Sequence, residues 1–236
     1  MRVAGIGLAA VVSATGCDAS DGIGASAGQE EDRVRYVALG DSYTIGTSVG
    51  EAERWPNQLV DRVGTLALVG NPAVNGYTSA DLIADELPLL DQLDPQLVSV
   101  LIGVNDVVQG VPDGQYATNV AVILDELLER VPADRIVCVA TPDYTRTPRG
   151  ADYGDPAEQS SGIVRVNAIL RDACALRRIA FVSEIFEISQ EAADDASLVA
   201  SDGLHPSGAQ YARWVDAIEP VVRRLLDGRS TPVAAS

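Results

Sequence analysis

Short apolar runs that each break into a polar loop constrain the fold of this sequence more than any other feature. Residues 97–102 are almost entirely apolar, as expected of a strand that is buried on both faces of a parallel sheet. Residues 34–39, 66–69, 135–140 and 180–183 are the other predicted strands. Helical patterns separate these runs, and strands alternating with helices predict an α/β protein with helices on both faces of a parallel sheet.

Five helices are predicted between and after these strands, at residues 55–63, 79–86, 116–130, 161–178 and 206–226. The second is expected to begin with Ser79 as its cap and to close before Pro88. Residues 141–160 are expected to form a polar loop. That loop is long for a compact domain, and long ordered loops are often functional.

Length and charge limit the class of protein. The 236 residues suit one α/β domain with a sizeable core. The formal net charge is -17, and all 17 basic residues are arginine. An acidic surface repels a phosphate backbone, so nucleic-acid binding is disfavoured.

The first 32 residues differ from the rest and are predicted to lie outside the fold. The apolar run at 3–12 is too short to span a bilayer but suits an export signal. The segment Ala14-Thr15-Gly16-Cys17 resembles a bacterial lipoprotein cleavage box, in which Cys17 would carry the lipid. This predicts an exported protein that meets a membrane only through that anchor, with a plain secretory signal as the alternative. Residues 18–32 are then a flexible tether, 33–228 the folded domain, and 229–236 a disordered tail.

Four polar loops carry the candidate chemistry, and each is predicted to follow a strand. They are Gly40-Asp41-Ser42, residues 71–78, Gly103-Val104-Asn105-Asp106, and residues 202–206. Open α/β sheets build their sites at the carboxyl ends of their strands. The four loops are therefore expected to meet at one edge of the sheet.

His205 is the only histidine in the chain, so it must be the base if an imidazole activates a serine. Asp202, three residues earlier, is placed to accept a hydrogen bond from its Nδ1–H. Each signal alone favours a purely structural role, because a serine in a turn is usually only a turn residue. Together and in this order they favour catalysis.

The four segments resemble blocks I, II, III and V of the SGNH hydrolases, also called the GDSL lipase/esterase family, over about residues 33–228. The resemblance implies a three-layer α/β/α sandwich like flavodoxin, with five parallel strands in the order 2-1-3-4-5 and no cofactor or metal. It implies Ser42 as nucleophile and Asp202 and His205 as the other triad members. Its oxyanion hole would be Ser42, Gly76 and Asn105. Ala73 departs from the family pattern, which often has glycine there.

These residues predict a serine hydrolase that cleaves small-molecule carboxylic esters through an acyl-enzyme intermediate. A carbohydrate O-acetyl esterase or a thioesterase would use the same triad, and a non-catalytic exported binding lipoprotein is an alternative of another class. Candidate substrate contacts are Tyr43, Asp143, Tyr144 and Arg146. Cys138 and Cys174 are expected to be buried, and the sequence leaves open whether they pair. It also leaves the oligomeric state open.

Overall fold

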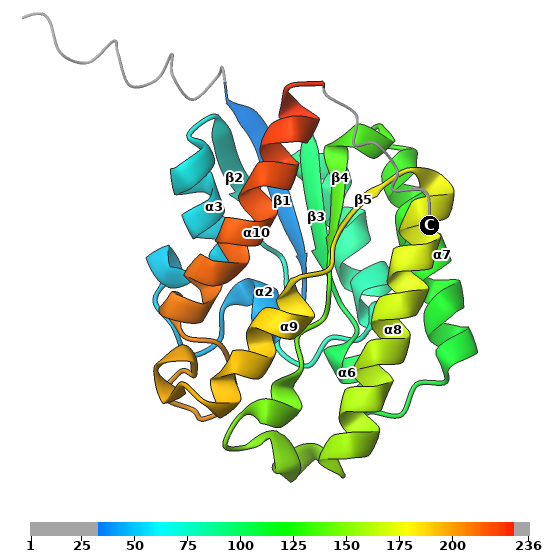
Figure 1. Ribbon diagram of the computed structural model, residues 1–236. Coiled ribbons are helices and arrows are strands. Elements are labelled where there is room, and N and C mark those ends of the chain that lie inside the picture. The colour runs from blue at the N-terminus through cyan, green and yellow to red at the C-terminus, as the bar shows by residue number, and fades with distance from the viewer. Residues whose placement is uncertain (1–32, 229–236) are drawn as a thin grey trace, which may run out of the picture. The chain divides into compact units, whose positions relative to one another are not determined.

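A parallel sheet of five strands forms the centre of the computed structural model, which describes residues 33–228 (Figure 1). The strand order is β2-β1-β3-β4-β5, and every neighbouring pair is parallel. The strands are β1 (Val34–Gly40), β2 (Leu66–Gly70), β3 (Leu97–Leu101), β4 (Ile136–Val139) and β5 (Ala180–Val182). The predicted fold class is confirmed. The predicted signal, tether and tail, Cys17 included, lie outside the described residues.

Helices cover both faces of the sheet and complete the three layers. The longer ones are α3 (Trp55–Val63), α7 (Asp113–Leu128), α8 (Pro156–Arg177) and α10 (Gly208–Leu226). The shorter ones are α2 (Ser42–Ile45), α4 (Ser79–Asp81), α5 (Leu90–Leu93), α6 (Val104–Val108) and α9 (Ile185–Gln190). Helices α3 and α10 lie side by side over one face (Figure 1). Within residues 33–228 no helix has the length and apolar character that crossing a bilayer requires.

The side chains of β1 alternate between two apolar cores. Tyr36 and Ala38 pack into the core beneath α3 and α10, whereas Val37 and Leu39 pack into the core beneath α7. All four side chains are fully buried. Burial on both faces is why the strand runs are apolar without a polar alternation, as the sequence indicated.

The register of the sheet decides which loops meet. Gly40, the last residue of β1, pairs with Leu101, the last residue of β3. The chain therefore leaves both strands at the same level of the same edge. This brings the loop that holds Ser42 beside the loop that holds Asn105.

The predicted ends of the second helix are wrong. Thr78, not Ser79, caps α4, because its side chain accepts from the backbone N–H of Asp81. The helical path does not close before Pro88. It continues through a π-helical turn (Leu82–Glu86) and a 3₁₀ turn (Leu87–Leu89) into α5. Pro88 lies in the first turn of that 3₁₀ segment, at the change from the π-helical turn.

The loop predicted at residues 141–160 is shorter than expected. Helix α8 begins at Pro156 instead of residue 161, because the Asp155 side chain caps it by accepting from two backbone N–H groups, each over 3.0 Å. Two 3₁₀ turns, Tyr144–Arg146 and Gly150–Tyr153, occupy much of the remaining loop.

Two cysteines lie between the sheet and α8, Cys138 on β4 and Cys174 on the helix. Both are buried, and both are free thiols. The structure therefore contains no disulfide between them, and their apolar burial is as predicted.

Candidate active site

Ser42 lies directly after the turn that ends β1. Gly40 has a φ of 153°, and a Cβ at this position would lie 2.3 Å from the carbonyl oxygen of Leu101, so only glycine fits. Asp41 then caps α2 by accepting from the Tyr43 backbone N–H over 3.0 Å. Ser42 is the first residue of that helix and is 7% exposed. The turn thus holds the serine at the carboxyl edge of the sheet.

His205 is held by Asp202. The imidazole Nδ1 lies 2.6 Å from Asp202 Oδ2, and the other carboxylate oxygen accepts from the backbone N–H groups of Leu204 and His205. Ser48 donates its hydroxyl to Asp202 Oδ2 over 2.8 Å. Burial opposes ionisation of Asp202, but the bonds from His205, Leu204 and Ser48 outweigh it and hold its pKa well below the usual value. An ionised Asp202 at Nδ1 leaves Nε2 as the nitrogen that is free to take a proton.

Asn105 belongs to α6, which follows β3. Its side-chain Nδ2 donates to the carbonyl oxygen of Tyr77 over 2.9 Å and lies 3.4 Å from Asp41 Oδ2. Gly76 lies in the loop after β2, and its carbonyl oxygen accepts from the Gln109 side chain over 3.1 Å. These bonds tie the loops after β1, β2 and β3 to one another.

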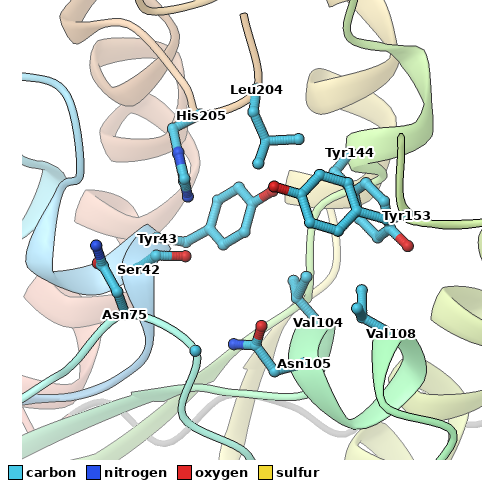
Figure 2. A pocket seen from close by; sticks show the side chains of 11 residues that line it. Ser42, Tyr43, Asn75, Val104, Asn105, Val108, Tyr144, Tyr153, Leu204 and His205 are labelled. Carbon is cyan, nitrogen blue, oxygen red and sulfur yellow. The ribbon is translucent and has the colours of Figure 1, made fainter. Parts of the chain in front are cut away.

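A cavity of about 280 Å³ opens over Ser42 (Figure 2). One end is polar, and there His205 extends towards Ser42. The other end is formed by apolar and aromatic side chains. The cavity is lined by Ser42, Tyr43, Asn75, Gly76, Val104, Asn105, Val108, Tyr144, Tyr153, Leu204 and His205.

Six of the residues singled out in the sequence line this cavity: Ser42, Tyr43, Gly76, Asn105, Tyr144 and His205. Asp202 does not line it but contacts His205, which does. Two candidate substrate contacts do not line it. Asp143 is fully buried and accepts from the hydroxyls of Thr145 and Ser160 and from Gln190, so it holds the loop together. Arg146 faces a separate surface groove, and its side chain is 54% exposed.

Several residues in or beside the cavity were missed in the sequence. Val104 and Val108 flank Asn105 on α6, and their i, i+4 spacing would have marked them had this five-residue helix been predicted. Tyr153 and Ser48 carried no local signal, because their positions depend on how their loops fold.

The fourth polar loop does not follow a strand, contrary to the prediction. Strand β5 ends at Val182, and α9 and two 3₁₀ turns intervene before Asp202. The loop is closed instead by an antiparallel bridge between Val199 and Pro206, with a bond from Ala200 N to the His205 carbonyl over 2.8 Å. This closure sets Asp202 and His205 at the sheet edge just before α10.

Three buried carboxyl groups support the site from below. Asp106 accepts from the backbone N–H and the hydroxyl of Ser79, over 2.9 and 2.5 Å, which agrees with a role in holding the loops. Burial raises the pKa of Asp41 to about 7, and the nearby charge of Asp106 adds to this. Burial likewise raises the pKa of Glu86 to about 8. Within residues 33–228, no three His, Cys, Asp or Glu side chains are grouped as metal ligands.

Comparison with known proteins identifies the family. The model of the GDSL-like lipase/acylhydrolase family matches residues 38–213, which is most of the chain. The chain belongs to this family. The matched segment contains Ser42, Asn105, Asp202 and His205.

Individual relatives resemble parts of the chain. An arylesterase from Vibrio mimicus is 31% identical over 90 residues, which is 37% of this chain and 45% of that protein, so the match spans less than half of the relative. The crystal structure of TesA is similar with a TM-score of 0.63 and 22% identity, covering 80% of this chain and 98% of that one. The psychrotrophic esterase EstA from Pseudoalteromonas sp. has a TM-score of 0.60 and 18% identity, covering 82% and 99%. At these identities the two structures support the fold alone.

Proposed function

We propose that this chain hydrolyses small-molecule carboxylic esters with Ser42 as nucleophile, His205 as general base and Asp202 as the group that orients the base. The observation that carries the proposal is the 2.6 Å contact between Asp202 and His205 beside a cavity that Ser42 also lines. A serine, an imidazole and an ionised carboxylate in this relation form the arrangement that activates a hydroxyl for acyl transfer.

The reaction takes two steps. His205 Nε2 takes the proton of Ser42 as Oγ attacks the ester carbonyl carbon, and it gives that proton to the departing alcohol oxygen when the carbon–oxygen bond breaks. A water then attacks the acyl-serine, His205 takes the water proton, and the proton returns to Ser42 Oγ as the acid leaves. Asp202 stabilises the imidazolium that forms in each step.

The negative oxygen of each tetrahedral intermediate is stabilised by three donors: the backbone N–H groups of Ser42 and Gly76 and the side-chain amide of Asn105. The bond from Asn105 to the Tyr77 carbonyl fixes that amide before substrate arrives. The longer 3.4 Å contact with Asp41 is the one that the oxyanion would replace. Donors that are fixed in advance need no reorganisation during the reaction, which is why they stabilise the transition state strongly.

A second candidate function differs only in the ester that is cleaved. An acetyl xylan esterase from Geobacillus stearothermophilus, studied as a variant of Axe2, shares the fold with a TM-score of 0.60 over 80% of this chain. A carbohydrate O-acetyl esterase would use the same groups, as would a thioesterase. A non-catalytic binding protein is the alternative of another class, and it would give no turnover.

Hydrolysis of p-nitrophenyl acetate by the full chain tests the proposal. Ser42→Ala should reduce turnover to background, because the nucleophile is gone. Asn105→Ala should lower kcat by roughly 10²–10³-fold, the usual effect of losing one oxyanion donor. Ser161→Ala, an exposed serine of α8 outside the cavity, is the matched control and should keep full activity. Turnover that persists in a folded Ser42→Ala would contradict the mechanism.

A further inference from the structure

The part of the cavity beyond Ser42 is apolar, and its residues form what we call the apolar arm: Tyr43, Val104, Val108, Tyr144, Tyr153 and Leu204. We propose that the apolar arm binds the acyl chain of the ester and that Tyr153 closes its far end, which restricts the enzyme to short acyl groups. This inference rests on the proposed serine hydrolase function and adds the substrate class.

Polarity divides the cavity along its length. Figure 2 shows Ser42, His205 and Asn75 at one end and Tyr144 and Tyr153 at the other. Leu204 and Val104 lie on opposite sides of the space between them. Within the apolar arm no charged side chain contributes to the lining. An apolar chain that extends from the carbonyl carbon at Ser42 would therefore leave water for a hydrocarbon and aromatic surface, which is favourable in proportion to the area buried.

The order of the reaction decides which part of the ester belongs in the arm. The alcohol departs after the first step, and water must take its place beside His205 before the second. The acyl group stays bonded to Ser42 throughout. The apolar arm therefore suits the acyl group, which stays bound, whereas the departing alcohol needs a path to solvent.

Two tyrosines form the far wall of the arm. Their ring centroids are 5.9 Å apart and their planes are nearly perpendicular at 84°, a favourable edge-to-face arrangement. Tyr144 is buried, and its hydroxyl lies 2.5 Å from the side-chain oxygen of Gln159. Tyr153 is 37% exposed. Tyr153 is therefore the boundary between the arm and solvent.

The loop after β4 is built so that Tyr153 reaches this position. A Cβ on Gly150 would lie 2.6 Å from the Tyr144 carbonyl oxygen, so the 3₁₀ turn Gly150–Tyr153 packs directly on the turn before it. The backbone N–H of Arg149 donates to the Gly203 carbonyl over 3.0 Å, which ties this loop to the loop of Asp202 and His205. The wall is thus hydrogen-bonded, through the residue before its 3₁₀ turn, to the loop of Asp202 and His205.

The size of the cavity agrees with a short acyl group. Its volume of about 280 Å³ lies just below the lower end of the roughly 300–1,000 Å³ of pockets that enclose drug-sized ligands. It must also hold the ester carbonyl and the oxygen of the alcohol. A long fatty acyl chain would have to pass Tyr153.

The test is a series of p-nitrophenyl esters, from acetate through butyrate and octanoate to laurate, with wild type, Tyr153→Ala and Tyr153→Phe. For wild type, kcat/KM should be highest for acetate or butyrate. Tyr153→Ala should raise the octanoate-to-acetate ratio of kcat/KM by about tenfold, the lower end of the effect of one methylene group in an apolar pocket. Tyr153→Phe keeps the ring and should keep the wild-type ratio. Leu176→Ala, at a highly exposed position on α8, is the control for rate and profile.

A second series holds the acyl group as acetate and lengthens the alcohol. Tyr153→Ala should leave that profile as in wild type, and a change there instead of in the acyl series would overturn the assignment of the arm to the acyl chain. An unchanged acyl profile in an active Tyr153→Ala, or a wild type that prefers laurate, would overturn the inference while the serine mechanism stands. Loss of Ser42-dependent turnover on every ester would overturn the proposed function and the inference with it.

Discussion

Ser48 adopts a left-handed backbone conformation, with φ of 68°, although it is not a glycine. Few residues with a side chain adopt this region, and those that do are enriched in asparagine and aspartate. The Ser48 hydroxyl donates to the same Asp202 oxygen that contacts His205 Nδ1. Ser48 is therefore a positioning residue, which acts on the imidazole through Asp202 and links the loop after β1 to the loop before α10.

Two substitutions separate the Ser48 hydrogen bond from its backbone. Ser48→Gly adopts the same φ without strain but has no donor, and it should lower kcat by several-fold, up to about tenfold, as expected for a lost bond to a charged group. Ser48→Asn tolerates this φ and has an amide donor, so it should recover most of the loss. Equal kcat in Ser48→Gly and wild type would contradict the positioning role.

The difference in Tm between Ser48→Gly and Ser48→Asn should depend on pH through Asp202. The folded pKa of Asp202 is lowered, so its bonds stabilise the fold above the usual carboxyl pKa of about 4, and this contribution is lost as the pH falls below it. Ser48→Gly should therefore have a lower Tm than Ser48→Asn at pH 7, and the difference should shrink below about pH 4.

Most polar residues of the cavity were predictable from the sequence, because a serine, a lone histidine and an asparagine in short polar loops together indicate a site. Ser42, Gly76, Asn105 and His205 all line one cavity as expected. Ser48 and Tyr153 were not predictable. A hydroxyl in a positive-φ turn and a tyrosine on a 3₁₀ turn gain their contacts only when distant loops pack together.

At the scale of elements, the segment between β2 and β3 supports the turn that carries Ser42. Its π-helical turn ends at Glu86, which is buried and accepts from the Gly40 backbone N–H over 3.0 Å. The other carboxyl oxygen, Oε1, has no partner among the described residues. Burial is the main reason that the pKa of Glu86 is about 8, and the charge of Asp41 adds to it.

This raised pKa predicts a pH-dependent stability. The folded protein keeps a proton on Glu86 between pH 4.5 and about 8, where the unfolded chain has lost it, so the free energy of unfolding falls as the pH rises through this range. Glu86→Gln resembles the neutral acid, so its Tm at pH 9 should be higher than that of wild type by a few degrees. In a domain of this size, each kcal/mol of unfolding free energy shifts the Tm by about 2–4 °C. At pH 5 the two should be close.

Thermal unfolding followed by circular dichroism from pH 5 to 9 measures this difference. Glu187→Gln is the matched control, because Glu187 is exposed on α9 and its substitution should leave the curve of wild type unchanged. Parallel Tm curves for Glu86→Gln and wild type would show that Glu86 does not titrate in this range. Asp41 retains its own raised pKa in every variant, so a smaller fall with pH should persist.

The strands were predictable because burial on both faces demands apolar runs, and all five strands lie within a residue or so of their expected ends. The short helices α2, α6 and α9 were not. Each has only four to six residues, too few to show a helical period, and each is held by its neighbours and not by its own sequence.

At the scale of the whole molecule, the strand order explains why segments far apart in the sequence form one site. Strand β1 lies between β2 and β3, so the loops after these three strands are neighbours at one edge. Helix α10 packs against α3 on one face, and the loop before it delivers Asp202 and His205 to the same edge. The strand order was implied by the family resemblance and not by the pattern of apolar residues. Export and lipidation at Cys17 stay predictions.

The central claim is that Ser42 is the nucleophile of this cavity, and its most direct test is covalent labelling of the full chain with a fluorophosphonate. We expect one adduct per chain, mapped by peptide mass spectrometry to Ser42 and absent from Ser42→Ala. His205→Ala should label far more slowly, because the base is missing. A folded chain with no adduct, or with its adduct on another serine, would show that Ser42 is not the nucleophile.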